Sequence, residues 1–372
     1  MHLHEAAQAI NASGMHAVAV GADAAIGAVV TDTRKLTPGC LFVALKGPRY
    51  DGHNFAAEAL RQGAAAVMVT ASAQLDVSPA LIVDDTLLAL GRLAAWHRGR
   101  MPARIAAITG SNGKTTVKEM LAAILGVEAG ADAVLATEGN LNNDIGMPLT
   151  LLKLNPKHRY AAIEMGMNHT GEIAYLTRIA RPDVALVNNA LRAHLAGLGS
   201  IEAVARAKGE IYAGLKDDGI ALVNADDPHA ALWLELADGH PVMRFGFSAH
   251  AEVRIVGGAP LTLETPQGRI EATLQVPGEH NQRNAAAAAC LALALGIAPA
   301  TIARGLSAYA GVKGRLQSHA CILGATLIDD TYNANPDSVL AAIQVLAQRP
   351  GHRILVLGDM GELGPDAAAL HR

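Results

Sequence analysis

The sequence has few aromatic residues, few cysteines and no surplus of positive charge, and each shortage excludes a class of protein. Phe, Trp and Tyr make up 3% of the 372 residues although 51% are hydrophobic, so Ala, Val, Leu and Ile supply most of the apolar content. That mixture is typical of helices packed on parallel strands. The formal net charge of −4 offers no basic surface to a phosphate backbone, and we expect no nucleic-acid partner.

The three cysteines, Cys40, Cys290 and Cys321, are scattered, without the spacing of metal ligands, and their number is odd. A disulfide framework is therefore not indicated, and we expect a reducing, cytoplasmic location. The first residues lack the basic start and apolar core of a signal peptide. The richest apolar run, residues 285–297, is shorter than the roughly 20 residues of a membrane span. We expect it to be a buried helix, and we expect no membrane insertion.

The most informative segment is 109–116, Thr-Gly-Ser-Asn-Gly-Lys-Thr-Thr, which directly follows an apolar run. Small residues let successive backbone N–H groups point at phosphate oxygens, and the next helix adds the positive end of its dipole. The lysine would neutralise the outer phosphates, and the hydroxyl after it could bind the magnesium that accompanies ATP. The candidate ATP-binding residues are Gly110, Ser111, Asn112, Gly113, Lys114, Thr115 and Thr116.

This segment departs from the usual GxxxxGK pattern because Ile108 occupies the first glycine position. A glycine-rich turn between a strand and a helix, carrying an incidental lysine, is the alternative interpretation.

Short apolar runs alternate with helical stretches along the chain, a pattern that predicts an α/β fold with a parallel sheet covered by helices. Several of these runs end in polar residues, as at Glu164 and at Asn188 and Asn189. Ligands of open α/β sheets bind beyond the carboxyl ends of the strands, so these ends predict one shared site. The predicted strands are 105–108, 160–163, 184–187, 220–223, 325–328 and 353–357.

We predict three domains: a small N-terminal α/β domain (1–84), a central P-loop domain (85–310) and a C-terminal domain (311–372). A helix over 86–98 would join the first two. The last domain holds about 60 residues, fewer than a complete Rossmann-like fold needs, so we expect it to be truncated.

Further candidates lie outside the glycine-rich segment. Glu164 and His194 follow neighbouring strands and could both reach a cation beside the phosphates, although either could simply be a hydrogen-bonded polar residue. Lys208 lies on a predicted helix and, taken alone, is most simply a surface lysine. Asn281 begins the alanine-rich helix and could be its cap.

Taken together, these segments resemble the Mur ligase family of ATP-dependent amide ligases. The resemblance runs from residue 31 to residue 364 and depends on the number and order of its motifs. They are segments 31–34, 109–116, 137–146, 164–167, 188–200, 207–211 and 314–315.

Residues 329–336, Asp-Asp-Thr-Tyr-Asn-Ala-Asn-Pro, are similar to the form found in the member that adds D-alanyl-D-alanine to UDP-N-acetylmuramoyl-tripeptide. Sister ligases look like DYAHTP here, and folylpolyglutamate synthetases like DGAHNP. The resemblance implies that ATP phosphorylates the tripeptide carboxylate, that the amine of D-alanyl-D-alanine attacks the acyl phosphate, and that the product is the peptidoglycan pentapeptide precursor.

The resemblance also implies roles for individual residues. Lys114, His194 and Lys208 match catalytic positions, and the positions that hold Mg²⁺ are matched by Thr115, Glu164, His194 and Lys208, the last as a carbamate. Asn281, Arg315 and Asp330 match residues that contact ATP. The region that binds the UDP-linked substrate is matched by Thr33, Arg34, Asn142 and Asn143.

The resemblance further implies a monomeric, cytoplasmic enzyme. Three alternatives stay open at this point: a related ligase such as a UDP-muramoyl-dipeptide ligase or folylpolyglutamate synthetase, a P-loop protein that binds ATP without ligating anything, and a non-catalytic truncated ATP-binding fragment.

Overall fold

The computed structural model describes residues 1–193, 195–361, 363 and 367–371, without the side chains of 195 and 196. The chain forms two compact units. The first comprises Met1–Pro102 together with Glu138–Pro156, and the second comprises Ala103–Thr137 together with Lys157–Arg372.

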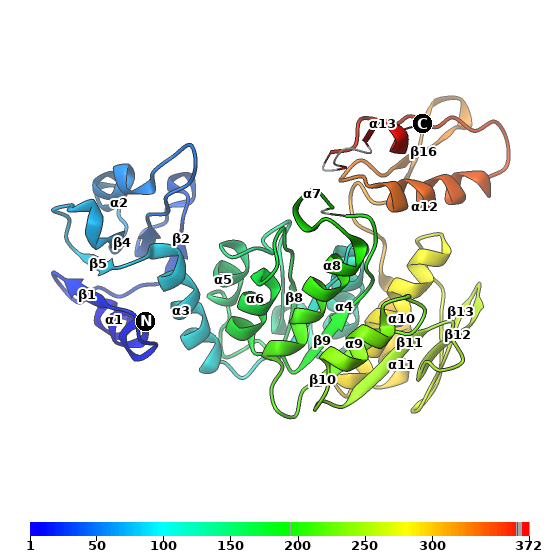
Figure 1. Ribbon diagram of the computed structural model, residues 1–372, viewed down its shortest axis with the longest axis horizontal. Coiled ribbons are helices and arrows are strands. Elements are labelled where there is room, and N and C mark those ends of the chain that lie inside the picture. The colour runs from blue at the N-terminus through cyan, green and yellow to red at the C-terminus, as the bar shows by residue number, and fades with distance from the viewer. Residues whose placement is uncertain (194, 362, 364–366, 372) are drawn as a thin grey trace. The chain divides into compact units, whose positions relative to one another are not determined.

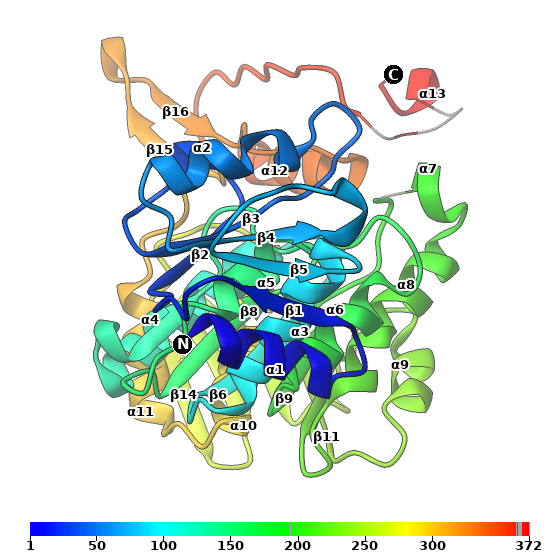
Figure 2. The ribbon, with the colours of Figure 1, turned by 90° about the vertical axis from the view of Figure 1, so that its left-hand side faces the viewer.

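The first unit is built on a five-stranded sheet in the order β1-β5-β4-β3-β2, in which only β1 runs antiparallel to its neighbour (Figure 2). Its strands are β1 (Ala17–Val20), β2 (Ala28–Val30), β3 (Cys40–Val43), β4 (Ala66–Thr70) and β5 (Ala80–Val83). Its helices are α1 (Leu3–Ala12), α2 (Ala56–Arg61), α3 (Thr86–Gly99) and α5 (Gly146–Leu151), with 3₁₀ turns η1 (Thr33–Lys35), η2 (Gly52–Phe55) and η3 (Ala71–Ala73).

Alternation along the strands divides this unit's core into two layers. In β3, Leu41 and Val43 pack in the layer that includes residues of α1 and α3, whereas Cys40 and Phe42 pack in the layer that includes residues of α2. Side chains of successive residues in a strand point to opposite faces, so a fully apolar strand indicates a sheet covered on both sides. The helix predicted over 86–98 is confirmed as α3.

The second unit holds a nine-stranded sheet in the order β14-β13-β12-β11-β10-β9-β6-β8-β7, parallel except at its β12-β13-β14 end (Figure 1). The parallel strands are β6 (Arg104–Thr109), β7 (Val134–Ala136), β8 (Tyr160–Glu164), β9 (Val184–Val187), β10 (Ile220–Asn224), β11 (Val242–Gly246) and β12 (Val253–Gly258). The sheet ends with β13 (Leu261–Thr265) and β14 (Gly268–Ala272).

Helices cover this sheet on both faces. One layer consists of α4 (Lys114–Ala129), α10 (Glu279–Ala294) and α11 (Pro299–Ala308). The remaining helices before residue 311 are α6 (Glu172–Ala180), α7 (Leu195–Leu198), α8 (Ile201–Gly209) and α9 (Ala230–Leu236). The 3₁₀ turns are η4 (Ala131–Ala133) and η5 (Glu210–Gly214). Residues 285–295 are all buried in the core that α10 shares with α4, which confirms the predicted buried helix. The strands predicted near 105, 160, 184 and 220 are confirmed as β6, β8, β9 and β10.

The last part of the second unit contains a hairpin of β15 (Gln317–Ala320) and β16 (Thr326–Asp329), the turn η6 (Ile322–Gly324), and helices α12 (Pro336–Ala347) and α13 (Ala367–Leu370). The strand predicted over 325–328 is confirmed as β16, but the strand predicted over 353–357 is wrong. Those residues belong to no helix or strand, and Ile354 and Val356 are 72% and 87% exposed. An apolar run becomes a strand only where another strand pairs with it, and none of the described strands does so here.

The expectation of no membrane insertion can be checked against the helices of the described residues. None of them combines the length and the apolar character that a membrane span requires.

Candidate active site

The loop between β6 and α4 is shaped by two glycines. Gly113 is the N-cap of α4 and has φ +81°, and Gly110 has φ +154°, both in the range that favours glycine. A Cβ atom at Gly113 would lie 2.4 Å from Asn284 Oδ1 and 2.6 Å from Asn188 Nδ2. The absence of side chains here brings the loop and the start of α4 close to the neighbouring strand end, where α4 presents the positive end of its dipole.

Asparagine side chains after β9 hold the loop in place. Asn189 Oδ1 accepts a hydrogen bond from the backbone N–H of Asn112 at 2.9 Å. Asn188 Nδ2 donates to the Asn112 carbonyl at 2.9 Å and to Asn284 Oδ1 at 3.0 Å. The conformation of the loop is therefore held by the two asparagines after β9, one of which is itself hydrogen-bonded to α10.

Lys114 folds back over the same loop. Its Nζ donates to the carbonyls of Gly110 at 2.8 Å and Ser111 at 3.2 Å. Burial lowers the pKa of Lys114 below the usual lysine value, Arg315 lowers it further, and the negative charge of Glu164 opposes both effects. Lys114, the first residue of α4, therefore places its amine on the phosphate loop, in surroundings that would favour binding of an anion.

Thr115, Glu164 and Arg315 meet beside Lys114. Thr115 Oγ1 donates to Glu164 Oε2 at 2.9 Å and accepts from Arg315 Nη2 at 3.1 Å. The carboxyl-terminal residue of β8, Glu164, is only 3% exposed. A hydroxyl and a carboxylate are oxygen ligands of the kind that Mg²⁺ prefers, so this pair fits the predicted metal site. Among the described residues, here or elsewhere, no three His, Cys, Asp or Glu side chains gather into a metal-binding group.

Lys208, at the end of α8, is 1% exposed, so its interpretation as a surface lysine is wrong. Its side chain makes no hydrogen bond or ion pair with another described residue. Burial, with an added contribution from the nearby charge of Lys114, lowers the pKa of Lys208 well below the usual value. Both effects favour the neutral amine, which is the nucleophilic form of this side chain.

The remaining ATP candidates lie around these groups. Asn281 donates from Nδ2 to the Pro277 carbonyl at 2.7 Å, and its Oδ1 accepts from Asn284 at 3.3 Å. It is not the cap of α10, because Gly278 is the N-cap and no side chain caps that helix. Asp330 Oδ1 accepts from the Leu316 N–H at 3.1 Å, next to Arg315, and burial raises the pKa of Asp330.

Of the remaining predicted residues, four lie in the first unit and one has no described position. His194 lies outside the described residues. Thr33, Arg34, Asn142 and Asn143 belong to the first unit. Arg34 lies in η1 with its side chain 87% exposed and paired with Asp32, and this pairing lowers the Asp32 pKa to about 2. Asn143 Oδ1 accepts the N–H groups of Ile145 and Gly146, where α5 begins.

Three family models match successive parts of the chain. The Mur ligase family catalytic domain matches residues 25–98, the Mur ligase middle domain 108–292, and the Mur ligase, glutamate ligase domain 314–372. The UDP-N-acetylmuramoyl-tripeptide–D-alanyl-D-alanine ligase of Escherichia coli K12 is 49% identical over 358 residues, which cover 94% of this chain and 78% of that relative. The chain belongs to the Mur ligase family.

Solved structures of Mur ligases have the same fold as this chain, including the three-domain architecture. Crystal structure I of MurF from Acinetobacter baumannii superposes with a TM-score of 0.90 at 40% identity, covering 98% of this chain and 81% of that one. The MurF ligase of Thermotoga maritima, solved in complex with ADP, gives a TM-score of 0.81 at 29% identity, covering 92% and 80%.

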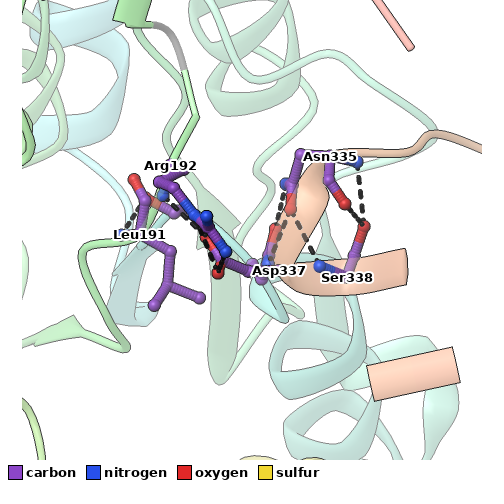
Figure 3. Close-up of polar contacts among 7 residues, drawn as sticks. Leu191, Arg192, Asn335, Asp337 and Ser338 are labelled. Carbon is purple, nitrogen blue, oxygen red and sulfur yellow. Dashed lines mark hydrogen bonds and ion pairs between the residues drawn. The ribbon is translucent and has the colours of Figure 1, made fainter. Parts of the chain in front are cut away.

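Sequence reasoning missed three residues of this Mur ligase that connect its last part to the phosphate loop. They are Arg192, Asn335 and Asp337, and Figure 3 shows their contacts. Asn335 and Ser338 form a capping box at the start of α12, and this local signal is readable in the segment Asn-Pro-Asp-Ser. The partners of Asn335 and Asp337 lie 223 and 145 residues away, so no local pattern reveals them.

Proposed function

We propose that this Mur ligase joins D-alanyl-D-alanine to UDP-N-acetylmuramoyl-tripeptide in an ATP-dependent reaction. One observation carries the proposal: Lys114, Thr115, Glu164 and Arg315 meet at the carboxyl ends of β6 and β8, in a chain 49% identical to a ligase of that name. The bound ADP of the Thermotoga maritima relative supports the choice of nucleotide.

The reaction must bring two anions together, because the tripeptide carboxylate attacks the γ-phosphate of ATP. A carboxylate oxygen forms a bond to phosphorus, the bond to the bridging oxygen breaks, and ADP leaves. Positive charges fixed in place before the reaction lower the cost of that approach. We assign this role to Lys114 on the loop and to Arg315, whose guanidinium already reaches Thr115 at 3.1 Å.

In the second half of the reaction, the amine of D-alanyl-D-alanine attacks the carbonyl carbon of the acyl phosphate. A tetrahedral intermediate forms and collapses, the new amide keeps the nitrogen, phosphate leaves, and the amine gives up a proton. The same positive groups would stabilise the charge on the departing phosphate.

Thr115 and Glu164 are the residues that we expect to hold Mg²⁺ together with the ATP phosphates, with His194 as a further predicted ligand. When bound, the ion would neutralise phosphate charge and polarise the bond to the transferred group. Lys208 joins this set if it reacts with carbon dioxide, because carbamylation converts a buried amine into an anion. Its burial and lowered pKa support that assignment.

The other predicted roles remain part of this proposal. Asn281 and Asp330 would contact ATP, and Thr33, Arg34, Asn142 and Asn143 would bind the UDP-linked substrate. The division at residues 84 and 310, a monomeric state and a cytoplasmic location are likewise proposed.

The test is phosphate release by the purified chain with ATP, magnesium, UDP-N-acetylmuramoyl-tripeptide and D-alanyl-D-alanine, omitting each component in turn. We expect release only when all four are present, together with a pentapeptide product identified by mass. Release that does not need D-alanyl-D-alanine, or that needs a different amine, would refute the substrate assignment. Glu164→Gln should abolish release while the variant still unfolds cooperatively.

A further inference from the structure

The last part of the second unit contacts the phosphate-loop region at three places. Arg315 reaches Thr115, and Asn335 pairs with Asn112. Asp337 pairs with Arg192 (Figure 3). The Asn335 and Asp337 contacts both involve the first turn of α12, of which Asn335 is the N-cap. This turn is therefore attached to two different loops of the central sheet.

The Arg192–Asp337 contact is the stronger of these two. Arg192 Nη2 donates to Asp337 Oδ1 at 2.7 Å, Nε lies 3.2 and 3.3 Å from the two carboxylate oxygens, and the backbone N–H of Arg192 donates to Oδ2 at 2.9 Å. A two-pronged guanidinium–carboxylate contact fixes orientation as well as distance. The pairing raises the pKa of Arg192, which stays charged.

Asn112 and Asn335 exchange hydrogen bonds through their side-chain amides. Asn335 Nδ2 donates to Asn112 Oδ1 at 2.6 Å, and Asn112 Nδ2 donates back to Asn335 Oδ1 at 3.3 Å. The same Oδ1 accepts the N–H of Ser338, so the cap of α12 and the phosphate loop share one amide group. A shift of the loop by a bound phosphate would thus reach α12 directly.

Arg192 itself is anchored to the phosphate loop. The N–H of its neighbour Leu191 donates to Ser111 Oγ at 2.9 Å, and this hydroxyl donates to the Leu191 carbonyl at 3.3 Å. The Arg192–Asp337 contact therefore links α12 to the phosphate loop through a short, continuous set of hydrogen bonds.

We propose that Arg192 and Asp337 are a positioning pair for the ligation reaction. They hold the first turn of α12 against the phosphate loop, and this contact keeps Arg315 at Thr115, where the transferred phosphate would lie. The proposal rests on the proposed function for its effect on rate, but the contact itself can be measured without substrates.

A matched control exists within the same sheet. Arg244 and Glu252 form the same pattern, with the backbone N–H at 2.7 Å, Nε at 3.2 Å and Nη2 at 2.6 Å, and with similar exposure. This pair connects β11 to the residue before β12 and does not involve α12. Arg244→Ala thus removes an equivalent ion pair from a place with no expected role in positioning.

The experiment compares Arg192→Ala, Asp337→Ala, the double variant and Arg244→Ala by two readouts. The first is hydrogen exchange of the Ser338 and Val339 amides without ligand, and we expect about tenfold faster exchange in Arg192→Ala. Arg192→Ala is decisive because Asp337 also stabilises α12 as an acidic residue in its first turn. The second is ligation, where we expect kcat to fall about tenfold while the Kd for ADP changes less than about threefold.

The double variant should lose no more than the larger single loss, because both changes break one interaction. Arg244→Ala should leave exchange at Ser338 and kcat within about twofold of the unaltered chain. Unchanged exchange in Arg192→Ala, losses that multiply in the double variant, or an equal loss in Arg244→Ala would each overturn the proposal. If the unaltered chain does not ligate, the proposed function fails, and the exchange measurement still decides whether the pair holds α12.

Discussion

Gly113→Ala is expected to be much more costly than an ordinary glycine replacement, for two separable reasons. Gly113 has φ +81° and ψ −7°, and a residue with a Cβ atom loses about 1–2 kcal/mol in the left-handed region. The new Cβ would also lie 2.4 Å from Asn284 Oδ1 and 2.6 Å from Asn188 Nδ2. These two amides must separate, which breaks a buried hydrogen bond worth about 1–3 kcal/mol when its partners are left unpaired. The expected total is about 2–5 kcal/mol.

Two matched glycines in the same unit separate these contributions. Gly171 is the N-cap of α6 with φ +89° and ψ −19°, and a Cβ there would meet nothing within 4 Å. Gly171→Ala should therefore show the backbone cost alone, about 1–2 kcal/mol. Gly126 lies inside α4 with open space around it, so Gly126→Ala should stabilise the fold by about 0.5–1 kcal/mol.

The assay is equilibrium unfolding in urea. The chain has two tryptophans, Trp96 in α3 of the first unit and the fully buried Trp233 in α9 of the second. In a Trp96→Phe background the fluorescence reports unfolding of the second unit. Equal losses in Gly113→Ala and Gly171→Ala would refute the role of the Asn188–Asn284 contact, and a loss in Gly126→Ala would refute the backbone reasoning.

Two further predictions concern Lys208. Lys208→Ala should abolish ligation, with partial rescue by added short carboxylates that replace the carbamate, and unchanged activity would exclude a carbamate at this position. In buffer free of carbon dioxide, the lowered pKa in the folded state means that the unfolded chain binds the proton more tightly. Stability should therefore rise with pH between the lowered pKa and the unfolded value near 10.5, and fall as pH decreases through that window. Lys208→Met should remove this contribution to the pH dependence of stability. It should also raise the free energy of unfolding at neutral pH, measured in urea, by about 1–3 kcal/mol. A variant no more stable than the unaltered chain would show that the buried amine costs no stability.

The sequence was sufficient to predict elements whose signal is local. The strand over 184–187 has the bounds of β9, because four apolar residues are followed by Asn188 and Asn189, which turn to the phosphate loop. Glu164 was placed beside Thr115 by the rule that the carboxyl ends of parallel strands share one edge. In both cases the order of residues in one short segment contains the decisive information.

Other features depend on which neighbours a segment meets, and these were not predictable. Taken alone, Lys208 looks like any helical lysine, and only the packing of α8 against α9, α6 and η5 shows that its amine is buried. Arg192 and Asp337 are 145 residues apart, and the sequence around either residue does not indicate that it contacts the other. The apolar run 353–357 has the pattern of a strand but no pairing partner among the described strands.

The charges of the site also explain why its stability and its function oppose each other. Lys114 lies near Glu164, Arg315 and Lys208, and the neighbouring positive charges lower the pKa values of both lysines beyond the effect of burial. Like charges held together in a folded chain cost stability, so this arrangement is expected only where a ligand compensates for it. A polyphosphate would do so, since its negative charges would favour the protonated lysines. The gain on binding should therefore be largest for the most highly charged nucleotide, which is the form that the proposed reaction consumes.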